Sequence, residues 1–446
     1  MEHVIYKTQI GNFKGNEYDV AFEFLGIPYA TAGRFEYSEL INFYGKDFDA
    51  TRMGNACPQY RQYYQNLDSP ERLFYYKEFR DGTKFNYDED CLNLNIYTPK
   101  DAQSCPVIVF FHGGGFNSGA NSEDPFRGFE LAKRGIITVF ANYRVGVLGY
   151  LCHEEIEKRY HRNGNFGLDD QLQAIRWVKD HISQFGGDPG NITLMGQSAG
   201  AISIQYLCLN HDNEGLFNKT VMMSGGGMFP KIALPRKAEN TYDYWCEFMD
   251  IAGFKSFEEI KYADIKLIHD AYEILRSARK DNVYNTMPVV DGYLIKDDVD
   301  KLISDPLKIG YMLGYTSNDM YAPMMAFIGN KYAKENGAYV YYFDIDQPGD
   351  NNGAFHSSDV RYMLGTMDSS WRPFRDRDKE VSKQMMDYLS NFAENKDPNG
   401  LDLPEWNKTD KHNNKVLCFN IRETKMGRPS YYKLIKNMII KGEPKA

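Results

Sequence analysis

The residues with the clearest chemical potential form a Gly-x-Ser-x-Gly pentapeptide around Ser198. An apolar run at 192–195 leads into Gly196, and small residues continue from Gly200 through 201–203. This order predicts a strand, a sharp turn and a helix, with the serine at the apex of the turn. A helix N-terminus behind the serine favours developing negative charge. The stretch indicates a serine nucleophile, although the pentapeptide alone also arises in ordinary glycine-rich turns.

A serine hydroxyl needs a base within hydrogen-bond reach, and catalytic groups of doubly wound sheets lie on loops after strands. The histidines that follow Ser198 are His211, His269, His356 and His412. His356 follows the apolar strand expected at 339–343 through a Gly- and Asp-rich loop. His211 and His412 lie in polar clusters, and His269 lies in a helical run. Placement therefore favours His356 as the base over a solvated loop histidine.

The acid that orients the base should lie between Ser198 and His356 in the chain. Asp319 closely follows the strand expected at 311–315 and is our choice. Asp344 and Asp346 fit less well, since they directly follow the strand that leads to the histidine. The competing interpretation of Asp319 is a turn or helix N-cap residue.

An oxyanion hole needs backbone N–H groups aimed at the developing charge. One donor is expected from Ala199, the residue after the nucleophile, and the others from Gly114 and Gly115 in a glycine run after an early strand. Only glycine lets backbone donors approach a substrate so closely. A flexible loop is the alternative for this run, and His112 before it is expected to be a structural hydrogen-bonding residue.

Strands and helices alternate through the part of the chain that carries these residues. Continuous apolar runs predict buried strands at 107–111, 136–141, 192–197, 220–223, 310–315 and 339–344. A helix is expected over 168–185, and a strand over 89–98 stops at Pro99. The order predicts an α/β fold with a mostly parallel sheet and helices on both faces.

The organisation predicted is one domain, 1–446, with a helical cap-type insertion at about 225–310. The first forty residues are expected to form short strands, and a Tyr- and charge-rich excursion at 36–84 shows no clean periodicity. Two closing helices are expected near 378–394 and 431–441.

Composition excludes several classes of protein. The net charge of −9 argues against a nucleic-acid partner, and no apolar run is long enough for a membrane span. Seven cysteines without a Cys-x-x-Cys pair argue against a zinc site, and we expect no metal and no organic cofactor. The first seven residues do not resemble a secretory signal, so a cytoplasmic location is expected. The oligomeric state is open, with a monomer possible.

Several motifs in order make the chain resemble the type-B carboxylesterases, the α/β-hydrolase branch that includes cholinesterases and bacterial para-nitrobenzyl esterases. The matching stretches are Gly26–Ala30, Glu89–Asn95, His112–Phe116, Asn142–Gly146, Asn165–Gln171, Phe185–Pro189 and Gly196–Ala201. The resemblance spans nearly the whole chain, and each motif is weak while their order is very specific.

The resemblance implies Ser198 as nucleophile, His356 as base, Asp319 as acid, and an oxyanion hole from Gly114, Gly115 and Ala199. It further implies that Ser224 supports the acid, and that Arg34–Glu89 and Arg144–Asp170 are structural ion pairs. Cys57 and Cys91 match a family disulfide, for which we predict free thiols in a reducing cytoplasm.

The sequence departs from the family in three ways. An aspartate stands where the acid is usually glutamate, Gln197 stands where glutamate is common, and the chain is shorter than many members. The shorter acid demands a closer loop, and the cap is expected to be reduced.

The function expected is hydrolysis of carboxylic esters through an acyl-enzyme. Tyr- and Met-rich stretches such as 320–325 suggest an apolar or aromatic pocket for a small-molecule ester with an aryl or short acyl group. A feruloyl or cinnamoyl-type esterase is the alternative, and amide or thioester cleavage at the same site is another. A catalytically inactive binding protein is the alternative of a different class.

Overall fold

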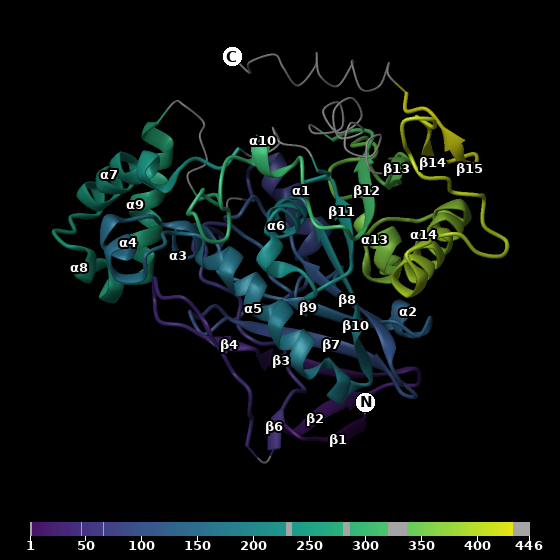
Figure 1. Ribbon diagram of the computed structural model, residues 1–446, viewed down its shortest axis with the longest axis horizontal. Helices are drawn as coiled ribbons and strands as arrows, with labels where there is room; N and C mark the ends of the chain where they lie inside the picture. Colours follow the sequence, from purple (N-terminus) through teal and green to yellow (C-terminus); the bar gives the residue numbers. More distant parts are fainter. Residues whose placement is uncertain are drawn as a thin grey trace.

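The computed structural model describes residues 2–45, 47–65, 67–228, 234–279, 286–319 and 337–430. One large twisted sheet runs through this part of the chain (Figure 1). Its strand order is β1-β2-β3-β7-β9-β8-β10-β11-β12-β13-β14-β15, and β6 pairs with β2 beside this path. The central strands are β7 (Asn93–Pro99), β8 (Cys105–Phe111), β9 (Ile137–Ala141), β10 (Gly187–Gln197), β11 (Lys219–Met223), β12 (Gly310–Thr316) and β13 (Tyr339–Asp344).

The middle of the sheet is parallel, as the continuous apolar runs predict. From β9 through β8, β10, β11, β12 and β13 to β14 (Val416–Asn420), each strand pairs in parallel with the next. All carboxyl ends of these strands therefore meet at one edge, where loops can gather side chains from distant parts of the chain.

The outer strands are antiparallel. On one side lie β1 (Glu2–Thr8), β2 (Gly11–Glu17) and β3 (Ala21–Pro28), followed by β7, which runs antiparallel to β9. Only residues 100–104 separate β7 from β8, and so short a connection reverses the chain. On the other side β15 (Thr424–Gly427) pairs antiparallel with β14.

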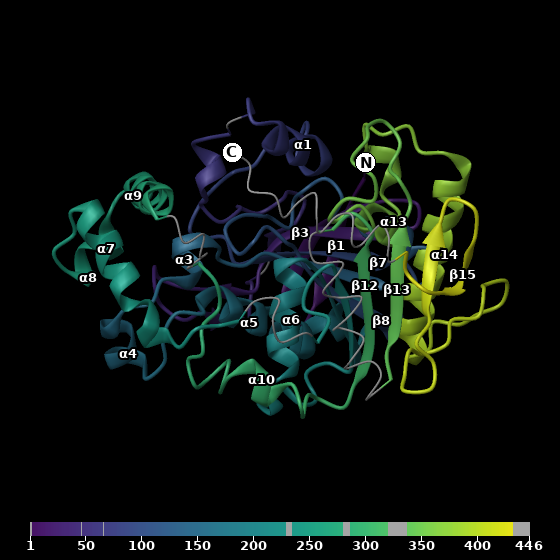
Figure 2. The same cartoon turned by 90° about the horizontal axis from the view of Figure 1, so that it is seen from above.

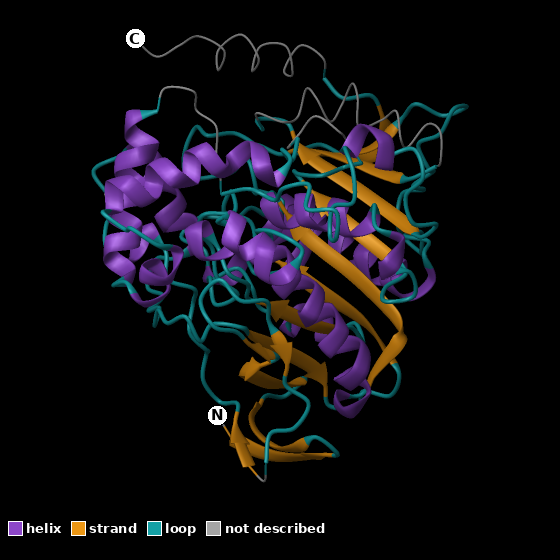
Figure 3. Ribbon diagram, turned by 60° about the vertical axis from the view of Figure 1, so that its left-hand side comes forward, coloured by secondary structure: helices purple, strands orange, loops and turns teal. Residues whose placement is uncertain are grey.

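Helices cover both faces of the sheet (Figure 3). Along β8, Val107, Val109 and Phe111 belong to one buried cluster, and Ile108 and Phe110 belong to another. The first cluster includes residues of α5 (Phe166–His181) and α6 (Ala199–Cys208), and the second includes residues of α14 (Asp376–Asn395). Since both faces of the strand are buried, its sequence is apolar at every position rather than at alternate ones.

A group of helices lies between β11 and β12 in the chain. It contains α7 (Tyr242–Ala252), α8 (Phe257–Tyr262), α9 (Ile265–Ala278) and α10 (Val299–Leu302). Helices α7 to α9 form a lobe at one side of the sheet, next to α4 (Glu154–Tyr160), and Figure 2 shows this lobe from above.

Arg34 attaches this lobe to the N-terminal part of the chain. Its guanidinium pairs with Glu89, as the family resemblance implies, and also donates to the carbonyl oxygens of Ile260 and Ala263 at 2.9 and 2.7 Å. One largely covered charge therefore joins the end of α8 to the N-terminal region of the chain.

The excursion at 36–84 contains a helix that the sequence did not reveal. Helix α1 (Pro70–Phe79) begins with proline at its first turn after Ser69, a favourable start. Its aromatic and charged residues show no amphipathic periodicity, and its buried residue is the charged Glu78. The other elements described in this region are short: β5 (Glu39–Leu40), β6 (Asp47–Asp49) and a 3-10 helix at Tyr60–Gln62. Strand β4 (Ala30–Thr31), which pairs with β5, lies just before it.

The closing helix expected near 378–394 is α14, whereas the one expected at 431–441 lies outside the described residues. Within the described ranges, no helix is both long and apolar enough to cross a membrane.

Candidate active site

Ser198 occupies a strained turn between β10 and α6. Its φ of 55° and ψ of −121° lie outside the regions that non-glycine residues commonly adopt. A Cβ on Gly196 would lie 2.7 Å from the Gly200 carbonyl carbon, and one on Gly200 would lie 2.2 Å from the Phe111 oxygen. Both glycines are therefore required for strand and helix to meet this closely. The Ser198 amide donates to the Met223 oxygen at 2.8 Å, which fixes the turn against β11.

His356 and Asp319 lie side by side on loops that follow neighbouring strands. Asp319 comes three residues after β12, and His356 lies in the loop that follows β13. Nδ1 of His356 is 2.7 Å from Oδ2 of the fully buried Asp319. Beside this contact, the backbone N–H of Asn318 donates to the backbone oxygen of Ala354 at 2.9 Å, so the two loops are also joined through their backbones. An Nδ1–H that donates to the carboxylate leaves Nε2 of His356 as the basic nitrogen.

That basic nitrogen faces the serine turn. The side-chain amide of Gln197, the residue directly before Ser198, donates to Nε2 of His356 at 3.0 Å and to Oγ of Ser357 at 2.8 Å. The structure therefore brings the histidine and acid singled out in the sequence to the end of β10. The sequence singled out Gln197 as a departure from its family, but not this contact.

The glycine run after β8 packs directly on the serine turn. A Cβ on Gly113 would lie 3.0 Å from Cβ of Ser198 and 2.3 Å from Oε1 of Gln197. Nδ1 of His112 contacts the Gly113 oxygen at 2.8 Å, and the Gly114 oxygen accepts from the amides of residues 117 and 118 at 3.1 Å each. Because each peptide is planar and trans, these carbonyl contacts turn the N–H groups of Gly114 and Gly115 the opposite way. The N–H of Ala199 is in the first turn of α6, where helix amides have no intrahelical acceptor.

His112 is a buried structural residue. Burial lowers the pKa of its imidazole to about 4, so the ring is neutral at pH 7. The ring stacks on Tyr143 with centroids 4.4 Å apart, and the Tyr143 hydroxyl donates to the His112 oxygen at 2.8 Å. These contacts hold the residue that orients the Gly113 carbonyl.

A hydrogen-bond relay that the sequence did not reveal connects the glycine loop to the helical lobe. Asn117 Nδ2 donates to the Gly115 oxygen at 2.9 Å, and Thr286 Oγ1 donates to Asn117 Oδ1 at 2.5 Å. The hydroxyl of Tyr272 on α9 lies 3.1 Å from Thr286 Oγ1. Asn117 and Thr286 are 169 residues apart and belong to no motif, so only the folded chain shows that they meet.

Two further buried groups lie on the strands and loops of the site. Ser224 has a φ of 48° and its amide donates to the Gly314 oxygen at 2.8 Å, while its Oγ has no hydrogen-bond partner among the described residues. Its expected support of Asp319 stays a prediction. Asp359, three residues after His356, accepts from the Tyr341 hydroxyl at 2.7 Å, and burial raises its pKa to about 6.

The described residues contain no group of three His, Cys, Asp or Glu side chains placed to hold a metal ion. The segment at 320–325, expected to line a pocket, lies outside the described residues. Cys57 and Cys91 are both buried and are free thiols in the structure.

A strained serine at the end of a central parallel strand, with an acid and a histidine after later strands, defines an α/β-hydrolase fold. The chain belongs to the carboxylesterase family, which it matches over residues 2–330 and 319–434. Both the fold and the family expected from the sequence are thereby confirmed.

Known proteins of this family are similar over long stretches. The para-nitrobenzyl esterase of Bacillus subtilis (strain 168) is 32% identical over 72% of this chain and 64% of its own length. The fumonisin B1 esterase of Sphingopyxis macrogoltabida is 31% identical over 67% of this chain and 52% of its own length. The chain thus spans less than two thirds of either relative.

Solved structures match the fold over nearly the full chain. A PNB esterase superposes with a TM-score of 0.81 at 25% identity, covering 98% of this chain and all of its own. An esterase from anaerobic Clostridium hathewayi that can hydrolyze aliphatic aromatic polyesters superposes with a TM-score of 0.82 at 22% identity, covering 97% of this chain and 98% of its own.

Proposed function

We propose that the protein is a serine hydrolase of carboxylic esters. The observation that carries the proposal is the 2.7 Å contact between His356 and Asp319, with Nε2 of the same imidazole turned to the Ser198 elbow through Gln197. This is the arrangement that converts a weak hydroxyl into a nucleophile.

In the proposed reaction, Oγ of Ser198 bonds to the ester carbonyl carbon while its proton moves to Nε2 of His356. The carbonyl electron pair moves onto oxygen, and the tetrahedral intermediate collapses as His356 gives the proton to the departing alcohol. Water then attacks the acyl-enzyme by the same route, and the acid is released. Asp319 holds the imidazole tautomer and stabilises the imidazolium, without itself taking the proton.

The oxyanion would be held by the N–H groups of Gly114, Gly115 and Ala199. Each donor of this kind contributes about 2.7–4 kcal/mol to transition-state stabilisation in comparable sites. The carbonyl contacts that turn the Gly114 and Gly115 amides away from their own loop support this assignment.

Small esters with an aryl or short acyl group are the proposed substrates. Phe74, Tyr75 and Phe355 gather beside the His356 loop, with the rings of Phe74 and Phe355 4.8 Å apart. Burial and the charge of Asp319 raise the pKa of Tyr75 to about 12, so its hydroxyl stays neutral. Aromatic walls of this kind suit apolar substrate groups, and cinnamoyl-type esters remain the alternative.

The experiment that tests the function compares the wild-type protein with Ser198→Ala on para-nitrophenyl acetate, together with labelling by a fluorophosphonate probe. We expect labelling and turnover in the wild type and neither in the variant. Wild-type turnover in Ser198→Ala would end the proposal, and an unlabelled wild type would favour the catalytically inactive binding protein. Matched ester, amide and thioester substrates then decide which acyl bond is cleaved best.

A cytoplasmic location is proposed as well. The seven cysteines are all free in the structure, which suits a reducing compartment. Fractionation of the native host with an antibody to the protein tests this location.

A further inference from the structure

The loop that carries His356 is hydrogen-bonded to the buried guanidinium of Arg372, whose side chain is only 1% exposed. Its Nη1 donates to the Pro348 oxygen at 2.8 Å and its Nη2 to Asp350 Oδ2 at 2.6 Å, both on the loop between β13 and His356. Its Nε donates to Oε1 of Glu78 on α1 at 3.0 Å. One side chain therefore fastens two points of the loop to a helix from the N-terminal quarter of the chain.

The same guanidinium packs against the residue next to the proposed base. It lies 5.1 Å from the ring centroid of Phe355 and 5.8 Å from that of Phe74 on α1. The Phe74 and Phe355 rings meet edge to face, with centroids 4.8 Å apart and planes at 87°. Phe355 is thus enclosed by Arg372 and α1. Since His356 directly follows Phe355 in the chain, the position of this ring constrains the backbone of His356.

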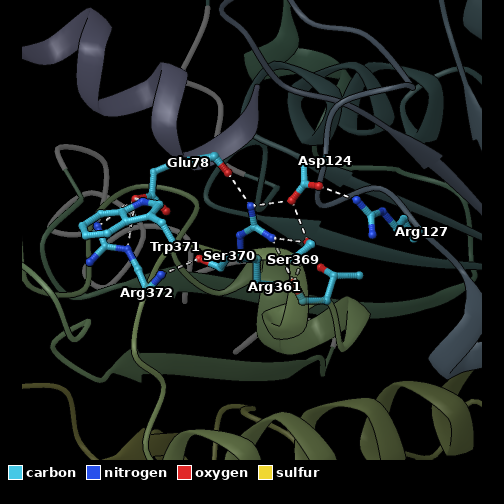
Figure 4. Close-up of polar contacts among 9 residues, drawn as sticks. Glu78, Asp124, Arg127, Arg361, Ser369, Ser370, Trp371 and Arg372 are labelled. Carbon is cyan, nitrogen blue, oxygen red and sulfur yellow. Dashed lines mark hydrogen bonds and ion pairs between the residues drawn. The ribbon is translucent and has the colours of Figure 1, made fainter. Parts of the chain in front are cut away.

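A second buried arginine binds the same end of α1 but not this ring. Arg361 donates to the Glu78 backbone oxygen at 2.6 Å and to Asp124 Oδ2 at 2.9 Å, and further to the Thr366 oxygen at 2.9 Å. Figure 4 shows both arginines converging on Glu78 from the segment after His356. Among the described residues, Arg361 has no aromatic ring stacked on its guanidinium. The two arginines therefore share an anchor and a buried setting, and differ in their contact with Phe355.

A buried charge requires its partners to stay in place, because removing one partner leaves the other charge buried and uncompensated. Burial opposes the charge of Arg372, yet its hydrogen bonds with Asp350 and Glu78 outweigh this effect and raise its pKa. The planar fork of arginine also fixes the direction of each bond, which a lysine ammonium would not do.

We propose that Arg372, anchored on Glu78, is a positioning residue for the base: it holds Phe355 in place and thereby sets the position of His356 relative to Asp319 and the Ser198 turn. This inference rests on the proposed ester hydrolysis by the same site. Arg372 touches neither substrate nor the reacting atoms, and it acts through Phe355 and through the loop that it holds at Pro348 and Asp350.

The test compares Arg372→Lys with the matched control Arg361→Lys. For Arg372→Lys, we expect kcat on para-nitrophenyl acetate to fall by about 10- to 100-fold with KM changed less than about twofold, as follows when a reacting group is misplaced by a fraction of an ångström to 1 Å. For Arg361→Lys, we expect a similar fall in Tm but a kcat within about threefold of the wild type, because the base stays in place. Equal kcat values in the two variants would overturn the proposal.

A spectroscopic readout keeps the inference testable apart from turnover. The downfield proton resonance of the Nδ1–H between His356 and Asp319 should move or broaden in Arg372→Lys and stay unchanged in Arg361→Lys. If Arg372→Lys does not fold, Phe74→Leu, which removes the ring that meets Phe355 edge to face and lies beside Arg372, should lower kcat with KM changed less than about twofold while Tm stays near that of the wild type. An unchanged kcat and resonance in Phe74→Leu would then overturn the proposal.

The two proposals fail in different ways. A wild-type protein without Ser198-dependent turnover would remove the proposed function and this inference together. An active wild type with an unchanged resonance and equal kcat in both lysine variants would remove the positioning role alone.

Discussion

The side-chain amide of Gln197 donates to the basic nitrogen of His356 across 3.0 Å. A neutral donor therefore occupies the imidazole lone pair that accepts the Ser198 proton in the proposed mechanism. Once Nε2 is protonated, it needs an acceptor, and the Gln197 amide can supply one only by turning its oxygen toward the ring. Gln197 thus favours the neutral form of His356, which is the form that the proposed mechanism uses as a base.

Gln197→Glu should shift the acid side of the pH profile of kcat/KM to higher pH by about one unit. A carboxylate within hydrogen-bond distance stabilises the protonated imidazole, so the basic form is lost at a higher pH than in the wild type. Gln384→Glu on α14, where the amide oxygen accepts from Thr424 at 2.7 Å, adds the same charge away from the site and is the control. Superimposable profiles for wild type and Gln197→Glu would contradict this role of the amide.

Thr286→Val should lower kcat by about three- to tenfold, as expected when a preorganised oxyanion loop loses a support but keeps its donors. The change removes the hydroxyl that holds Asn117 and, through it, the Gly115 carbonyl. Steady-state kinetics with a small aryl ester measures the effect. Thr241→Val is the matched control, since its buried hydroxyl donates to the Ala238 oxygen within the helical lobe and has no part in the relay. Equal loss in both variants would show a general effect on stability.

Gly114→Ala should lower kcat by about 100-fold or more, the usual effect of losing an oxyanion donor. Its φ is +118°, and an added Cβ would lie 2.0 Å from the Ser118 oxygen, so the loop must move. Gly215→Ala, with φ at +83° and no atom within 4 Å of the added Cβ, should cost only about 1 kcal/mol of stability. Kinetics and thermal unfolding of both variants separate loop displacement from backbone strain.

Asp359→Asn should gain stability relative to the wild type as the pH rises. Burial raises the pKa of Asp359 from 3.8 to about 6, so the folded state holds its proton more tightly than the unfolded chain. The wild type therefore loses stability as the pH rises from about 4 to about 6, by about 3 kcal/mol from this group, and little more above that range. Urea unfolding at pH 4.5 and pH 8 measures the difference in unfolding free energy between Asp359→Asn and the wild type. This difference should favour the variant more at pH 8 than at pH 4.5, and an identical difference at both pH values would contradict the prediction.

The parts of the fold that the sequence predicts are those governed by local patterns. Strands buried on both faces are continuously apolar, as at Val107–Phe111, and the Ser198 pentapeptide fixes a strand, turn and helix within a dozen residues. The chain order of acid and histidine then left few candidates, and the pair selected, Asp319 and His356, lies in direct contact.

The parts that the sequence does not predict depend on contacts between distant segments. Helix α1 is anchored by Arg361 and Arg372, nearly 300 residues further on, and its own sequence has no amphipathic period. The connection of Asn117 to Thr286 and the contact of Gln197 with His356 likewise require the folded chain. The direction of β7 is a further example. The short connection at 100–104 reverses the chain between β7 and β8, but only the folded sheet shows that β9 lies between these two strands and pairs antiparallel with β7.

The attachment of the helical lobe by Arg34 bears on how this protein can change over evolutionary time. Arg34 donates to main-chain oxygens at the end of α8, which every amino acid supplies, and not to the side chains of Ile260 and Ala263. Substitutions at the end of α8 therefore leave the carbonyl oxygens that Arg34 binds in place, as long as the backbone keeps its conformation. The lobe can therefore diversify in sequence while its attachment through Arg34 stays the same.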